Sequence, residues 1–113
     1  MKPLRCSALA LLLAVGALPA ADNEGVTFFE KNIRPLFAEH CLKCHDATQN
    51  KSKGGLTLDT RVGWEKGGDT GPAIVPGKPD ESLLFKALTY THDDVKMPPK
   101  KKEGQLPDNK IAV

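Results

Sequence analysis

The chain has 113 residues, among them 16 Lys and Arg, 14 Asp and Glu and three Cys, and this length allows at most one small domain. Lys2 and Arg5 are the only charged residues before Asp22, so the rest of the chain is neutral overall, and its charge gives no reason to expect nucleic-acid binding. With one Trp, one Tyr and four Phe beside 10 Gly and 9 Pro, it can bury only a modest core. Small domains of this kind usually need a covalent staple or an internal filler.

The first 21 residues have the pattern of a secretory signal peptide. Two basic residues precede an apolar run over 8–18, and small residues follow it before the first acidic side chain. The run is too short to span a bilayer comfortably, although a retained N-terminal anchor is the alternative. We therefore predict a signal peptide at residues 1–21, an exported domain at residues 22–113, a periplasmic location, and no membrane association beyond export.

The three cysteines divide between this signal peptide and one short motif. Cys6 lies before the apolar run and would leave with the signal peptide, so only Cys41 and Cys44 remain in the exported domain. A disulfide between two cysteines three residues apart closes too small a loop to stabilise a fold much. We therefore expect these two cysteines to serve another purpose.

The segment before these cysteines has the periodicity of a helix. Apolar side chains recur at every fourth position from Phe29 to Cys41, which places them on one helical face. Pro35 interrupts the pattern, and proline is tolerated in the first turn of a helix but not in its interior. We therefore predict a short helix over about 26–32 and a second helix that begins at residue 34 or 35 and reaches 45.

The rest of the chain predicts loops with one clear helix. Residues 46–79 are rich in Gly, Lys, Asp, Thr and Pro, which is typical of turns. A proline and an aspartate then open a helix over about 80–90, whose apolar face holds Leu83, Leu84, Ala87 and Leu88. Another helix begins near 107, shortly before the last residue. These elements predict an all-α fold with long loops.

The cysteine motif carries the chemistry. In a helix, Cys41, Cys44 and His45 stand at i, i+3 and i+4, so all three project on one side. C-x-x-C-H is the arrangement of c-type haem attachment, in which each sulfur forms a thioether to a haem vinyl group and the histidine supplies a nitrogen to the iron. In an exported chain this motif favours a covalently attached haem c, which would also fill the small core.

Two other uses of the motif stay open. A structural zinc site needs four ligands, and beyond the two cysteines the chain offers only His40, His45 and His92. A redox-active disulfide of the thioredoxin type needs the cysteine pair between a strand and a helix, whereas the segment before Cys41 is helical in pattern. Both alternatives fit the sequence less well than a haem.

A haem iron bound by one histidine has a sixth position, for which the sequence offers two side chains. Met97 lies in the polar loop "DDVKMPPKKK", where a methionine that only filled the core would be out of place, so we predict Met97 as the sixth ligand. His92, or no side chain at all, is the alternative and would suit a sensor that binds a diatomic ligand. We expect His40 to be structural or exposed, on the side of the helix away from the haem. Trp64 and Arg61 are candidate donors to haem propionates.

Four stretches of the sequence resemble the planctomycete-type cytochrome c domain. They are "FFEKNIRPLFAEHCLKCH", "KGGLTLDT", "GGDTGPAIVPGKPDESLLFKAL" and "DDVKMPPKKK", and the resemblance covers about residues 26–113. It implies a small class I-like cytochrome c fold, haem c attached through Cys41 and Cys44, and iron ligation by His45 and Met97. It further implies one-electron transfer to a redox partner protein or a fused domain. We expect no enzymatic activity from this domain alone.

One departure from the family pattern concerns the end of the domain. Similar domains continue past the position of Ile111 into a final helix with a tryptophan and a Gly-Ala-Pro-Trp-like end, which this sequence lacks. We therefore expect a C-terminally truncated domain from a longer parent protein, with its final helix incomplete. The apolar face that carries Phe29, Ile33 and Phe37 would then stay partly uncovered, and the domain would be marginally stable.

Overall fold

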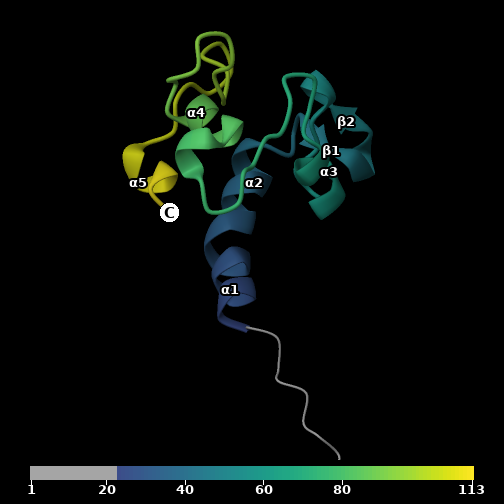
Figure 1. Cartoon of the computed structure of the whole chain (residues 1–113), viewed down its shortest axis with the longest axis vertical. Coiled ribbons are helices and arrows are strands. Elements are labelled where there is room, and N and C mark those ends of the chain that lie inside the picture. The colour runs from purple at the N-terminus through teal and green to yellow at the C-terminus, as the bar shows by residue number, and fades with distance from the viewer. Residues whose placement is uncertain (1–22) are drawn as a thin grey trace, which may run out of the picture.

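The computed structural model of the protein describes residues 23–113 (Figure 1). The predicted signal peptide lies outside the described residues. None of the described helices is long and apolar enough to span a membrane. The helices and strands are α1 (Asn23–Phe28), a π-helical segment (Phe29–Ile33), α2 (Arg34–His40), β1 (His45–Asp46), β2 (Lys51–Ser52), α3 (Arg61–Lys66), α4 (Leu83–Leu88) and α5 (Asp108–Ile111).

The N-terminal segment is one continuous helical stem. It contains a π-helical turn just before Pro35, where the sequence predicts a break between two helices. Pro35 has no N–H to donate within the helix, and the wider turn before it, in which the N–H of Arg34 bonds to the carbonyl of Phe29, accommodates this loss. Phe29 and Phe37 pack edge to face across this turn, with ring centroids 6.5 Å apart. The helix ends at His40 and not at residue 45 as predicted.

The prediction of an all-α, class I-like fold is wrong, because the chain forms an antiparallel two-stranded sheet after the stem. His45 pairs with Ser52 and Asp46 with Lys51. The turn between the strands is possible because Asn50 adopts a left-handed conformation, with φ 54°. Since each strand has only two residues, the sequence contains no hydrophobic alternation from which the strands could be predicted. The structure is a mixed one, with short helices and a small sheet.

Helix α3 also lies within the segment predicted as loop. Thr60 caps it, since its hydroxyl accepts a hydrogen bond from the N–H of Gly63 at 3.1 Å. The helix then packs closely on the preceding loop: a β-carbon at Gly63 would lie 2.1 Å from the Thr57 hydroxyl. Only glycine fits at this point of contact.

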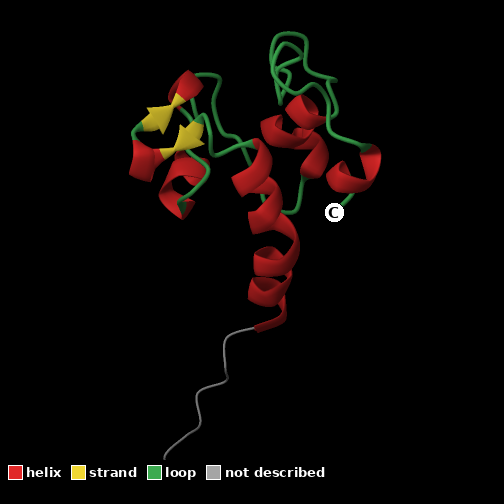
Figure 2. Cartoon of the chain, turned by 180° about the vertical axis from the view of Figure 1, so that it is seen from behind, coloured by secondary structure: helices red, strands yellow, loops and turns green. Residues whose placement is uncertain are grey.

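The chain after the stem forms two lobes, one on each side of α2. Figures 1 and 2 show β1, β2 and α3 on one side, which we call the hairpin lobe (residues 45–66), and α4, the following loop and α5 on the other, which we call the α4 lobe (residues 83–111). The buried apolar side chains are few and mostly small: Leu58, Ala73, Ala87 and Leu106. The described residues therefore do not fill the space between the lobes.

Candidate functional site

The cysteine motif forms a hydrogen-bonded turn directly after α2. The N–H of Cys41 bonds to the carbonyl of Phe37 at 2.9 Å, which joins the turn to the helix. The N–H groups of Cys44 and His45 both bond to the carbonyl of Cys41, each at 3.1 Å. The turn thus keeps the i, i+4 hydrogen bond of a helix although α2 has ended, and it places the three residues of the motif within one turn of backbone.

The hydrogen bond made by His45 fixes which of its ring nitrogens is free. The residue is only 8% exposed, and its Nδ1 lies 3.0 Å from the backbone carbonyl oxygen of Leu56. A carbonyl oxygen only accepts, so Nδ1 carries the hydrogen and Nε2 keeps its lone pair. This tautomer is the one that a metal-binding histidine needs, and the carbonyl also fixes the orientation of the ring.

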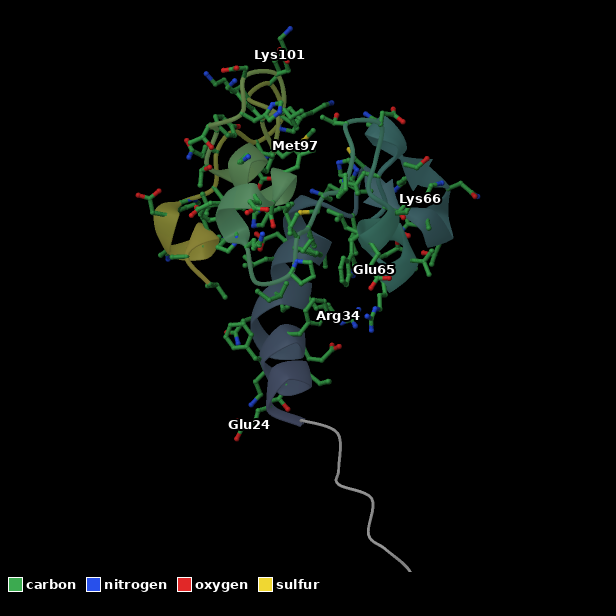
Figure 3. All side chains as sticks on the ribbon, in the orientation of Figure 1. Glu24, Arg34, Glu65, Lys66, Met97 and Lys101 are labelled. Atoms are coloured by element: carbon green, nitrogen blue, oxygen red, sulfur yellow. The ribbon has the colours of Figure 1, made fainter. Side chains whose placement is uncertain are left out.

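The three motif residues and Met97 line the same cavity. Its volume is about 1020 Å³, at the upper end of the ~300–1,000 Å³ range of ligand pockets. The hairpin lobe contributes Leu58 to its walls and the α4 lobe contributes Ala87. In Figure 3 Met97 lies beside α4, on the side that faces the hairpin lobe. The structure therefore brings together the four residues that the sequence singles out.

Two hydrogen bonds hold the backbone around Met97 against α4. The N–H of Met97 donates to the carbonyl of Ala87 at 3.0 Å. The hydroxyl of Tyr90, just past the end of α4, donates to the carbonyl of Pro98. These bonds fix the start of the loop, so that the half-buried Met97 side chain stays at the cavity wall.

His92 has a different environment from Met97. Its Nδ1 accepts hydrogen bonds from the backbone N–H groups of Asp94 at 3.2 Å and Val95 at 3.1 Å, within its own turn. It is not among the residues that line the cavity. Of the two side chains considered for the sixth position, the structure brings only Met97 to the cavity.

The two thiols are free, and burial makes one of them a poor nucleophile. Burial, with a smaller contribution from the Glu103 carboxylate, raises the pKa of the Cys41 thiol to about 11. A redox-active cysteine pair needs a thiol whose pKa lies near or below neutrality. The environment of Cys41 is the opposite of that, which argues against the redox-disulfide alternative.

The zinc alternative also lacks support. Within residues 23–113 no three side chains of the types His, Cys, Asp and Glu cluster in a way that could hold a metal ion.

The two candidate donors to haem propionates, Arg61 and Trp64, do not line the larger cavity. Arg61 is exposed and pairs with Glu65 at 2.7 Å, and Trp64 lines an adjoining apolar cavity of about 450 Å³ beside the stem.

His40 is the residue whose position the sequence analysis misses. Its side chain is 4% exposed and lies among charged groups, and the residue also lines the larger cavity. The expectation of a structural histidine agrees with this burial and with its bond to Glu103, whereas the expectation that it lies on the side away from the cavity is wrong. The partner that explains its position is Glu103, which is too distant in the chain for any local sequence pattern to connect the two.

The comparison with known families agrees with this geometry. A family model described as Planctomycete cytochrome C matches residues 41–101, which is more than half of the chain and includes the motif and Met97. The chain belongs to this family. Membership gives it a haem-binding, cytochrome-type function and confirms the resemblance predicted from the sequence. No curated protein and no solved structure matches the chain.

The residues of this planctomycete cytochrome fit a covalently bound haem c. Two free thiols, an imidazole with an available Nε2 and a thioether line one cavity. Most of the exposed wall is apolar, which suits a porphyrin. The cavity also lies where the protein's own side chains leave the space between the lobes unfilled.

Proposed function

We propose that this planctomycete cytochrome c is a one-electron carrier whose haem is attached through Cys41 and Cys44 and ligated by His45 and Met97. The observation that carries the proposal is that these four side chains line one cavity although Met97 is more than 50 residues away in sequence. A bound haem iron supplies one-electron oxidation and reduction. We propose no catalytic role for the domain itself.

The chain contributes attachment, orientation and exclusion of water. Thioethers at Cys41 and Cys44 would fix the group to the turn after α2, and the Leu56 carbonyl would keep Nε2 of His45 directed away from the backbone. Leu58 and Ala87, both nearly buried, limit access of water from the two lobes. Met97 would hold the iron through its sulfur, and a methionine ligand would raise the reduction potential relative to a second histidine.

The alternative of a haem-based sensor is less well supported. It needs an open sixth position or ligation by His92, and His92 uses its Nδ1 within its own turn and does not line the cavity. The periplasmic location rests on the signal peptide pattern of residues 1–21 alone and stays a proposal with the rest.

The test is to produce the protein with haem-maturation machinery and compare three forms of it. Intact-mass measurement and a pyridine haemochrome spectrum of the unmodified protein report covalent attachment. The weak sulfur-to-iron charge-transfer band at the red end of the ferric spectrum reports ligation by methionine. We expect Met97→Ala to abolish this band and His92→Ala, the matched control, to leave it unchanged. Loss of the band in His92→Ala, or its persistence in Met97→Ala, would refute the assignment of the sixth ligand.

The cavity rim suggests the charge of the redox partner. Two acidic residues, Asp94 and Glu103, line the cavity, but they are outnumbered by lysines from both lobes and from the cysteine turn: Lys43, Lys53, Lys96, Lys101 and Lys102. Such a rim attracts an acidic surface, whether of a separate partner protein or of a domain fused to this one. We expect Lys101→Glu to slow reduction of an anionic small-molecule oxidant at low salt, while Lys31→Glu on the distant π-helical segment has little effect. A rate that does not depend on ionic strength would contradict this role of the rim.

A further inference from the structure

A cluster of charged groups surrounds the buried ring of His40 at the end of α2. Nδ1 of His40 lies 2.5 Å from a carboxylate oxygen of Glu103, in the loop after Met97. Nε2 lies 3.1 Å from the ammonium group of Lys110 in α5 and 3.3 Å from the carboxylate of Glu39. The ring therefore connects three segments: α2, the Met97 loop and α5.

The partner of Nδ1 assigns the hydrogen on that nitrogen of His40. A carboxylate only accepts, so Nδ1 donates to Glu103. The ring thus lies between the carboxylate of Glu103 and the ammonium group of Lys110, and Glu39 lies 3.6 Å from the same ammonium group. Hydrogen bonds to charged partners are stronger than neutral ones, especially when one member is shielded from water as His40 is.

The loop after Met97 connects the contact between His40 and Glu103 to the backbone of Met97. The N–H groups of Lys102, Glu103 and Gly104 all bond to the carbonyl of Pro99, at 2.9, 3.2 and 3.2 Å. Glu103 is therefore part of a compact turn that begins only two residues after Met97. The other end of this segment is held to α4 by the Met97 N–H and the Tyr90 hydroxyl.

Among the described residues, the bond between His40 and Glu103 is the only side-chain hydrogen bond that joins α2 to this loop. We propose that His40 is a positioning residue, which fastens the Met97 loop to the helix leading into the cysteine turn and so holds the Met97 sulfur at the cavity. The inference rests on the proposed ligation by Met97. Without the bond, the loop would be held only at its ends, to α4 by the Met97 N–H and to α2 through Lys110 of α5, and its middle could move away from the cysteine turn.

The experiment uses the haem-loaded protein and asks how often the Met97 position opens. Carbon monoxide binds the ferrous form only when the sixth position is open, so its apparent affinity reports the open fraction. We expect His40→Ala and Glu103→Ala each to raise this affinity about fivefold, the effect of losing one partly exposed charge-assisted hydrogen bond, and to weaken the ferric sulfur band. Trypsin should also cut faster at Lys100, Lys101 and Lys102.

Three further variants separate positioning from general stability. His40→Asn keeps an amide donor near the place of Nδ1 and should restore most of the band, whereas the double variant His40→Ala with Glu103→Ala should be no worse than either single one. Glu30→Ala, on the same helical stem but paired with Arg34 and not with His40, should leave the band and the affinity unchanged. If His40→Ala does not fold, Glu103→Ala decides, since the Glu103 side chain is 43% exposed and its removal leaves little cavity.

The outcomes distinguish this inference from the proposed function. If Met97→Ala removes the sulfur band while His40→Ala and Glu103→Ala keep it, with unchanged carbon monoxide affinity, the positioning role is wrong and the ligation stands. A lower melting temperature with unchanged band and affinity would likewise overturn the positioning role. If Met97→Ala leaves the band unchanged, the proposed ligation itself is wrong, and the positioning role falls with it.

Discussion

The environment of Cys41 makes a quantitative prediction about thiol reactivity in the haem-free protein. Its thiol pKa is raised to about 11, chiefly by burial. At pH 8 about a thousandth of such a thiol is ionised, against about a quarter of an ordinary cysteine with a pKa near 8.5. A more basic thiolate is also a better nucleophile, which restores about tenfold to twentyfold of the loss for a Brønsted coefficient of about 0.4–0.5. The net expectation is a reaction about twentyfold slower than in the unfolded chain.

The assay needs only one cysteine at a time. In the variant Cys44→Ala, the reaction of Cys41 with an aromatic disulfide reagent is followed at pH 8, with and without urea, and then as a function of pH. Cys6 is removed in both variants so that it does not contribute. The variant Cys41→Ala reports Cys44, which is half-buried like Cys41, as the matched control. The Glu103 carboxylate is the second cause of the raised pKa, so Glu103→Gln should move the midpoint of the Cys41 profile slightly toward neutral pH.

A fast reaction of Cys41 in the native haem-free protein would contradict this prediction. If Cys41 reacts in the native haem-free protein as fast as in urea, with a midpoint near pH 8.5, the turn after α2 does not shield it before haem attachment. The burial of the turn would then have to arise with the haem, and the argument from Cys41 against a redox-active cysteine pair would lose its basis.

Three further predictions concern the scaffold. Leu58→Ala removes a side chain that is 5% exposed and lines both cavities, so we expect a loss of about 2–5 kcal/mol in the free energy of unfolding, measured with urea. Gly63→Ala would place a β-carbon 2.7 Å from the carbonyl oxygen of Thr57, and it should cost about 1–3 kcal/mol in the same experiment. Hydrogen bonds hold the pKa of Asp46 below its ordinary value, and the bond from the Thr48 hydroxyl has the largest effect. The ionised Asp46 carboxylate should therefore stabilise the fold fully above about pH 4, and this contribution should be lost as the pH falls further. Asp46→Asn should flatten this part of the acid-unfolding curve.

The sequence predicts the parts of the site that depend on local spacing. The residues Cys41, Cys44 and His45 lie within five positions, so any helical turn there brings them together, even though α2 itself ends at His40. The selection of Met97 over His92 also follows from a local argument, since a methionine in a polar loop needs a reason to be there. These inferences do not depend on knowing how the rest of the chain folds.

The sequence does not predict the features that depend on backbone atoms or on distant partners. The carbonyl of Leu56, which orients His45, has no side-chain signature. The β1–β2 hairpin depends on the left-handed Asn50 and on the Asp46 side chain, which accepts from the N–H of Gln49, and its strands are too short to show alternation. The bond between His40 and Glu103 joins residues 63 positions apart, and only the folded chain brings them together.

The same geometry explains why a group bound between the lobes would unite the fold. Leu58 of the hairpin lobe and Ala87 of the α4 lobe line one cavity, and each is buried within its own lobe. Other apolar residues of the walls, Leu56, Leu84 and Leu88, are only half-buried, so a group that occupies the space between the lobes would shield them from water. A group that binds the folded chain and not the unfolded one stabilises it by mass action, and covalent attachment through the cysteine turn makes this effect permanent. The contacts of His40 with Glu103 and Lys110 then have a second consequence, because they join the Met97 loop and α5 of the α4 lobe to the end of α2.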